Sequence, residues 1–200
     1  MTKIKKLLTD YFAEKELGHK GGLYSDFYTA KIGRFNFLLP NTKGRKRALI
    51  KHDVHHLLTG YNVDFLGELE IGGWELGSGC GNYTGIWALN LIGMATGLFL
   101  IPRRTFRAFV RGRKSTNLYR MNIAENEIGE MTLQNVGLKI GLADVDVHVS
   151  FWDILIFVSW SFIALLTLIL SPPYYFAALT ILLFKNGWRP FIVRNIGFQK

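Results

Sequence analysis

The stretch HDVHHLLTGYNVDFLGE, residues 52–68, holds three of the five histidines of this 200-residue chain. On a helix, His52 and His56 lie one turn apart and differ by about 40° in direction. Asp53 lies about 100° from His52, at the edge of the same stripe. Two imidazoles and a carboxylate of one helix can therefore reach a single metal ion.

The same stretch contains a turn that brings a fourth ligand back. A continuous helix would point Glu68 about 160° away from the histidines. Gly60 and Asn62 suit the left-handed residue that ends a helix, so we expect one helix over residues 47–58 and a second over residues 64–76. Two imidazoles and two carboxylates suit zinc, iron(II), manganese or cobalt, with positions left for water or substrate.

The remaining histidines separate this pattern from rival metal sites. His55 lies about 60° from the stripe on the other side, which leaves it as a spare ligand, a group behind the ligands or an acid/base, and we take it as the candidate catalytic residue. The integral-membrane desaturases need several histidine boxes, but only His19 and His148 stand elsewhere in this chain. A phosphohydrolase of the His-Asp type would need an earlier histidine and a later aspartate. His19 with Asp144 or Asp146 could be nominated, without support for their geometry.

Two segments near the motif have alternative interpretations. Residues 84–101 carry no charge and are long enough to count as a transmembrane candidate. Asn90 and the neighbouring polar regions favour a buried helix that lines a lipid pocket. Gly93 and Gly97 have the spacing that lets helices approach closely, and the alternative for them is ordinary core packing. The basic cluster at residues 43–47 is either a solvated loop or a contact with lipid phosphates.

The C-terminal part changes composition abruptly. Residues 125–141 predict the last helix of the polar part, and residues 152–170 then contain a single charge. About 19 residues of helix would just cross the hydrocarbon core of a bilayer. Pro172 and Pro173 predict its end. The apolar residues 174–184 are too few to cross unaided, and they predict either a short second arm of a hairpin or an interfacial piece after a single span. The basic residues that follow place this end on the cytoplasmic side, so a cytoplasmic metal domain requires a hairpin. The alternative is a helix buried in a protein core.

Composition limits the classes of partner. Lys and Arg number 24 against 15 Asp and Glu, for a net charge of +9, while 49% of residues are apolar and the mean hydropathy is +0.17. The charge favours an anionic partner, and the apolar runs favour an acidic lipid surface over nucleic acid. The single cysteine, Cys80, excludes an intramolecular disulfide. Residues 1–11 lack the pattern of a secretory signal.

These patterns predict an all-α protein in two parts. Residues 1–146 form a helical metal-binding domain, and residues 147–200 form a hydrophobic transmembrane helical hairpin with a basic tail. The membrane is the expected location, with the metal domain on its cytoplasmic side, and a homo-oligomer is compatible with the pattern.

The motif also resembles that of a known family, the Coq-four family of ubiquinone (coenzyme Q) biosynthesis proteins. The family signature is H-D-x-x-H-x(11)-E, which this chain matches at His52, Asp53, His56 and Glu68, with Gly67 before the glutamate. A looser resemblance extends over residues 23–142. The apolar segment at residues 152–184 departs from the family pattern.

The resemblance implies an all-helical fold and a divalent metal, usually zinc, held by the four matching residues. It further implies a peripheral place on a membrane beside other ubiquinone-biosynthesis proteins, with a hydrophobic channel for a long isoprenoid tail. The family is associated with oxidative C1 decarboxylation of a polyprenylated hydroxybenzoate, in which hydroxyl replaces the carboxylate. The metal would act there as a Lewis acid toward the carboxylate.

Two other functions remain open at this point. The chain could be a non-catalytic lipid-binding scaffold whose metal is structural, or a metal enzyme that acts on another lipid. An open coordination position favours an enzyme, whereas a closed site whose loss unfolds the protein favours a scaffold.

Overall fold

The computed structural model describes residues 2–14, 27–32, 35–40, 43–142 and 148–186 of the chain. Helices dominate the described part, as expected from the sequence. The helices are α1 (Ile4–Glu14), α2 (Lys43–Thr59), α3 (Phe65–Ser78), α4 (Thr84–Leu100), α5 (Pro102–Arg113), α6 (Glu125–Glu130), α7 (Leu133–Lys139) and α8 (Phe151–Asn186).

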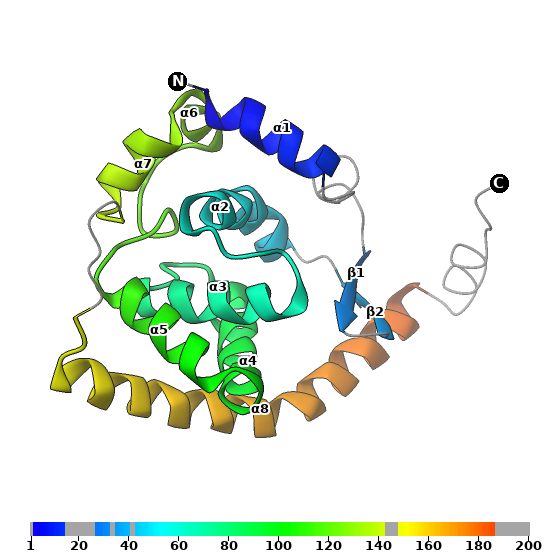
Figure 1. The fold of residues 1–200 in the computed structure, drawn as a ribbon. Helices are drawn as coiled ribbons and strands as arrows, with labels where there is room; N and C mark the ends of the chain where they lie inside the picture. Colours follow the sequence, from blue (N-terminus) through cyan, green and yellow to red (C-terminus); the bar gives the residue numbers. More distant parts are fainter. Residues whose placement is uncertain (1, 15–26, 33–34, 41–42, 143–147, 187–200) are drawn as a thin grey trace.

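One antiparallel β-hairpin adds to the helical class that the sequence predicts. Its strands are β1 (Phe27–Ile32) and β2 (Phe35–Pro40), and they pair from Phe27 with Pro40 to Ile32 with Phe35. The all-α class predicted from the sequence did not include these two short strands. The hairpin lies at one side of the helical body (Figure 1).

Helix α3 lies at the centre of the body, between α2, α4 and α5 (Figure 1). Its contact with α5 is close because glycines face each other across it. A Cβ atom on Gly77 would overlap the carbonyl of Phe109, and one on Gly112 would overlap the carbonyl of Trp74. Gly97 of α4 packs in the same way against Thr105, which favours core packing as the role of that glycine. These close contacts set the short separation of α3 and α4 from α5.

The turn signals around the motif act as expected. Gly60 adopts a φ of 75° and its N–H donates to the carbonyl of His56, which ends α2. The carboxylate of Asp64 accepts a hydrogen bond from the N–H of Gly67 at 2.8 Å and so caps α3. Helix α2 begins earlier than expected, so the basic cluster at residues 43–47 is its first turn rather than a loop.

The helix expected over residues 125–141 is two short helices, α6 and α7. The break falls at Met131 and Thr132, because the Thr132 hydroxyl caps α7 by accepting from the N–H of Asn135. The interruption frees the carbonyl of Met131 to accept from the N–H of Ile4, which fastens α1 to the body.

The predicted C-terminal hairpin is wrong. Helix α8 runs for 36 residues through Pro172 and Pro173 instead of ending there, and it curves along one edge of the body (Figure 1). Proline at position 172 removes the N–H that would reach the carbonyl of Leu168. The Ser171 hydroxyl donates to that carbonyl at 2.9 Å and compensates for part of the loss.

Within the described residues, one helix is long and apolar enough to cross a membrane. It is the segment Phe151–Pro172 of α8, with 22 residues and a mean hydropathy of 2.5. The domain boundary expected at residues 146–147 lies outside the described residues, which leave out 143–147. Helix α8 packs against α4 and α5, so it shares a core with the helical body.

Candidate metal centre

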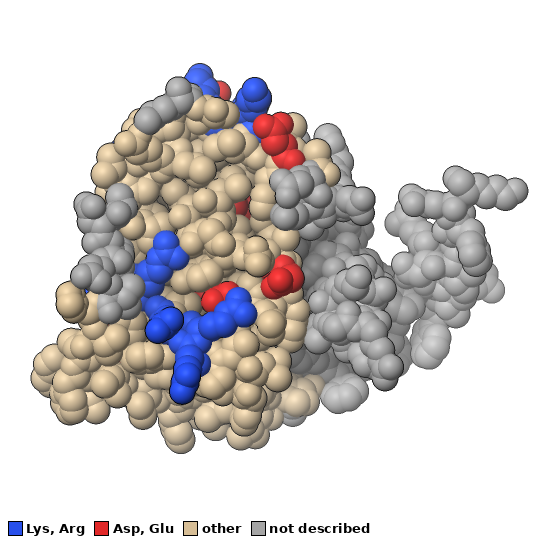
Figure 2. Space-filling model, viewed as in Figure 1, with Lys and Arg blue, Asp and Glu red and all other residues tan. Residues whose placement is uncertain are grey.

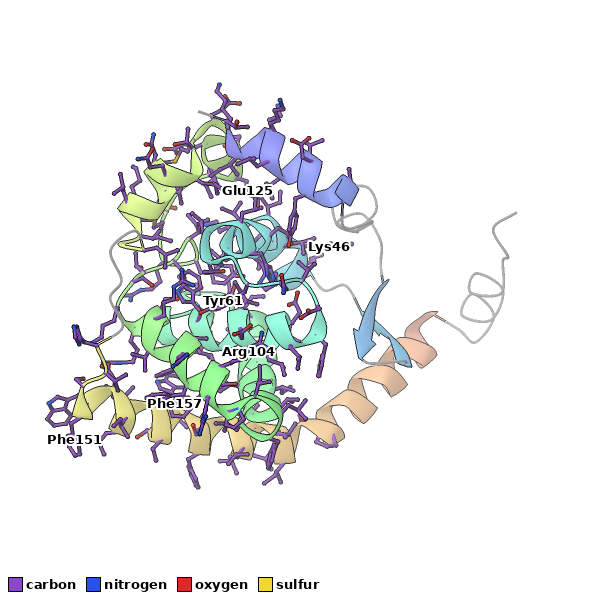
Figure 3. The ribbon with its side chains drawn as sticks, viewed as in Figure 1. Lys46, Tyr61, Arg104, Glu125, Phe151 and Phe157 are labelled. Atoms are coloured by element: carbon purple, nitrogen blue, oxygen red, sulfur yellow. The ribbon has the colours of Figure 1, made fainter. Side chains whose placement is uncertain are left out.

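Helices α2 and α3 supply the residues of the candidate site. His52, Asp53, His55 and His56 come from α2, and Glu68 comes from the first turn of α3. Tyr61, in the connection between the two helices, lies beside them (Figure 3). The turn that begins at Gly60 folds α3 back against α2, so residues 16 positions apart come into contact.

Three donor groups converge at this corner. The Nε2 atoms of His52 and His56 lie 3.2 Å apart. One oxygen of Glu68 lies 3.3 Å from the His52 Nε2, and the other lies 3.3 Å from the His56 Nε2. These three residues, whose ligand atoms lie within 4.8 Å of one another, could hold a metal ion.

The hydrogen bonds of the other ring nitrogen, Nδ1, of His52 and His56 indicate that a cation would stabilise the corner. The Nδ1 atom of His52 lies 2.9 Å from an oxygen of Glu75, and that of His56 lies 2.9 Å from the carbonyl of Tyr61. A carbonyl and an ionised carboxylate accept hydrogen bonds, so each Nδ1 carries a proton and each Nε2 faces the corner, where it offers a lone pair whenever no proton is bound to it. Two lone pairs and a carboxylate at 3.2–3.3 Å repel one another unless a metal ion or a proton lies between them. The donor set therefore fits a divalent ion.

The charges of the site reflect the same need. Burial alone would lower the pKa of His52, but the charge of Glu75 and hydrogen bonds with Glu68 and Glu75 raise it well above its ordinary value. Burial would raise the pKa of Glu68, but hydrogen bonds with His52 and His56 lower it to about 2. In the absence of metal, a proton on His52 thus takes the place that a cation would fill, and metal and proton compete for the site.

Asp53 occupies a different position from the other motif residues. It is buried, but within the described residues it does not belong to the group of converging ligand atoms. Its negative charge acts on Tyr119, whose pKa burial already raises well above its ordinary value. Asp53 turns about 100° away from His52 around α2, which is the angle that the sequence predicted. Its role as a ligand stays a prediction.

Behind the ligands lies a buried carboxylate, Glu75. One of its oxygens accepts from the Nδ1 atoms of His52 at 2.9 Å and His55 at 2.8 Å, and the other accepts from the side-chain amide of Asn90 at 2.7 Å. Burial would raise the pKa of Glu75, but the charge of His52 and the histidine hydrogen bonds keep it far below its ordinary value. Glu75 is therefore an ionised carboxylate that sets the tautomer and the direction of His52.

His55 lies in the same buried network. Its side chain has no exposed surface, its Nδ1 donates to Glu75, and its Nε2 accepts from the backbone N–H of Leu118 at 3.1 Å. Burial lowers its pKa, so the ring is neutral. Among the three roles left open for His55, this geometry favours the group behind the ligands. Its assignment as a catalytic residue stays a prediction, with both nitrogens already engaged.

Glu75 and Asn90 are the site residues that the sequence analysis missed. A signal for Glu75 exists, because seven residues after Glu68 a helix returns to nearly the same direction, about 20° away. Its position within the otherwise uncharged residues 71–78 of α3 is a second signal, since a buried carboxylate needs partners. Asn90 was noted only as an argument against a membrane span. In the structure its amide explains its presence, because it donates to Glu75.

Comparison of the chain with protein-family models, with curated proteins and with solved structures finds no match in any of the three. The resemblance of residues 52–68 to the Coq-four family stays a prediction from the motif.

Proposed function

We propose that this chain is a metal-dependent protein of ubiquinone biosynthesis that acts on a polyprenylated hydroxybenzoate at a membrane. The observation that carries the proposal is the convergence of His52, His56 and Glu68, whose spacing is that of the motif described above. The apolar helix α8 supports the membrane location.

The proposed reaction replaces the C1 carboxylate of the ring by hydroxyl. One carbon–carbon bond breaks, carbon dioxide leaves, and the ring carbon gains one oxygen atom. Dioxygen is the class of oxidant, and two molecules of the carboxylic acid with one molecule of dioxygen balance two molecules of the phenol and two of carbon dioxide. A bound divalent ion would contribute Lewis-acid stabilisation of the negative charge on the substrate oxygens.

The residues of the chain have separate tasks in this proposal. His52, His56 and Glu68 bind the ion, and Asp53 is the fourth ligand that the motif predicts. Glu75 keeps the His52 ring in its ligand tautomer, because it accepts from Nδ1. Zinc is the proposed ion, with iron, manganese and cobalt as alternatives of the same donor preference. Membrane lipid, a prenylated quinone precursor and other quinone-biosynthesis proteins are the proposed partners, with the metal domain on the cytoplasmic side.

The test begins with the metal content of the detergent-purified protein, measured by mass spectrometry. We expect roughly one divalent ion per wild-type chain and none in His52→Ala/His56→Ala. His148→Ala is the matched control, because His148 is an exposed histidine outside the corner, and it should keep the ion. Absence of metal from the wild-type protein even after reconstitution would overturn the proposal.

A second measurement separates an enzyme from a scaffold. The metal-loaded protein is given a polyprenylated hydroxybenzoate labelled at the carboxyl carbon, with dioxygen present, and released carbon dioxide is counted. Wild-type protein should release label and Glu68→Ala should not, while both keep their helical content. A metal-loaded protein that never releases label, and that unfolds when the ion is removed, would be a lipid-binding scaffold with a structural metal.

A further inference from the structure

Helix α8 has one face on the body and one face in the open. The inner face repeats every three or four residues and packs against α4 and α5. Asp153 and Ala164 are buried on it, and Trp160 stacks on Trp87 with ring centroids 5.3 Å apart. Phe157, labelled in Figure 3, packs edge-on against Phe106 at 4.9 Å. The first half of α8 is thus part of the folded body.

The outer face of α8 is apolar, and none of the other described segments covers it. Each of its large hydrophobic side chains is between 41% and 71% exposed. Its members are Phe151, Trp152, Ile154, Leu155, Val158, Phe162, Ile163, Leu166, Ile169 and Leu170. Between residues 154 and 172 the sequence contains no charged residue. Twenty residues of helix extend for about 30 Å. The outer face is therefore one continuous apolar stripe, whereas the exposed apolar side chains of a soluble surface are usually scattered singly.

The N-terminus of α8 is locked to α5. The Ser150 hydroxyl accepts from the N–H of Asp153 at 3.2 Å, and the Asp153 carboxylate accepts from the N–H of Ser150 at 2.9 Å, which forms a reciprocal cap. The same carboxylate forms ion pairs with Arg113 at 2.8 Å and Lys114 at 3.0 Å. Polar contacts therefore hold the helix in its place along the body.

This attachment conflicts with a helix that crosses a bilayer. The inner face touches α4 and α5 over residues 153–168, so a perpendicular α8 would carry both helices into the hydrocarbon. Helix α5 bears the exposed arginines Arg103 and Arg107, and charged side chains are costly at that depth. A helix parallel to the surface, in contrast, exposes only its outer face to the acyl chains.

We infer that α8 lies in the plane of an anionic bilayer, with its outer face among the acyl chains and the arginines of α5 at the phosphates. Figure 2 shows Lys and Arg side chains gathered over α5 next to the charge-free surface of α8. The net charge of +9 favours an anionic surface and disfavours a second copy of the same chain. The inference rests on the membrane location proposed above and is independent of the metal and the substrate.

Depth measurements on α8 test this arrangement. Leu155→Cys, Phe162→Cys and Ile169→Cys place a nitroxide on one stripe at intervals of two turns, over about 21 Å. Depths are measured on vesicles of equal parts phosphatidylcholine and phosphatidylglycerol. Cys80 is fully buried, so the wild-type chain serves as the labelling blank. An in-plane helix gives three similar depths. A depth maximum at residue 162, with residues 155 and 169 near opposite surfaces, overturns the inference in favour of a crossing.

Two further variants sharpen the result. Ala164→Cys lies on the inner face and should resist labelling on vesicles if α8 stays docked. Arg103→Gln/Arg107→Gln should weaken vesicle binding on the order of tenfold, whereas Lys5→Gln/Lys6→Gln on α1, across the body from α8 (Figure 1), should not. Rapid labelling of Ala164→Cys overturns the docked arrangement. If the protein does not bind vesicles and forms dimers in solution, both the inference and the proposed membrane location are overturned. The metal content is measured independently and is not affected by that outcome.

Discussion

The donor corner of α2 and α3 and the outer face of α8 differ in the range of the contacts that create them. His52 meets Glu68 and Glu75 across 16 and 23 positions of sequence, with two capped helix ends between them. Helix α8 is anchored across 40 positions, by the pair Arg113 and Asp153. The corner depends on directional hydrogen bonds between near neighbours. The outer face depends on which side of an apolar helix the rest of the chain covers.

This difference has a physical consequence for interpretation. Polar donors converge only at defined distances and angles, so residue types and spacing restrict where they can meet. Burial of apolar surface is non-directional and roughly proportional to area. A helix that is apolar all round can be buried, cross a membrane or lie on one, and its own residues do not choose between these.

The largest effect should follow from removal of the buried carboxylate behind the corner. Glu75→Ala leaves the donors of His52, His55 and Asn90 without their acceptor, so we expect a loss of about 3 kcal/mol or more in the free energy of unfolding. Urea denaturation of the metal-free protein measures it. Glu127→Ala, on the exposed side of α6, is the control and should change stability by less than about 0.5 kcal/mol.

The conservative variant at the same position separates orientation from folding. Glu75→Gln keeps the shape but removes the charge that holds the Nδ1 proton of His52, so zinc affinity should fall about tenfold or more while the fold is kept. Competition with a chelating dye measures the affinity. Unchanged zinc binding in a folded Glu75→Gln protein would show that Glu75 serves packing alone.

A smaller effect is expected where α8 joins the body. Asp153→Ala removes the reciprocal cap with Ser150 and the ion pairs with Arg113 and Lys114. We expect the free energy of unfolding to fall by about 2 kcal/mol. Amide exchange should rise in the first turns of α8 and stay unchanged in α2. Ser150→Ala, which loses only part of the cap, should cost about 1 kcal/mol. Equal exchange in α2 and α8 after the change would mean that the two regions unfold together.

The smallest effect concerns pH at the corner. The folded-state pKa of Glu68 is about 2, below its ordinary value of 4.5, because of its hydrogen bonds with His52 and His56. A lowered carboxyl pKa contributes stability that is present above pH 4.5 and is lost as the pH falls toward 2. In metal-free protein, Glu68→Gln should therefore flatten the stability profile in this window. Since Glu68 is partly exposed, the change should be modest, and parallel profiles of both proteins would contradict the proposed pairing.

Several expectations from the sequence are confirmed by particular contacts. Gly60 ends α2 and Asp64 caps α3, as the turn residues predict, and Glu68 consequently returns to the histidines. The failures have equally specific causes. Thr132 caps a new helix inside the stretch read as one, and the Ser171 hydroxyl supports the backbone where two prolines indicated a stop.

The sequence by itself determined the elements whose cause is local: the helix ends at residues 60 and 64, the facing of His52 and His56, and the apolar character of α8. Only the tertiary structure decided that Glu75 and Asn90 stand behind the donors, and that α8 runs through its prolines with one face on α4 and α5. Caps and helical periodicity act over a few residues and can be read in order. The pairing of distant surfaces depends on which apolar areas the rest of the chain buries, and this is a property of the whole fold.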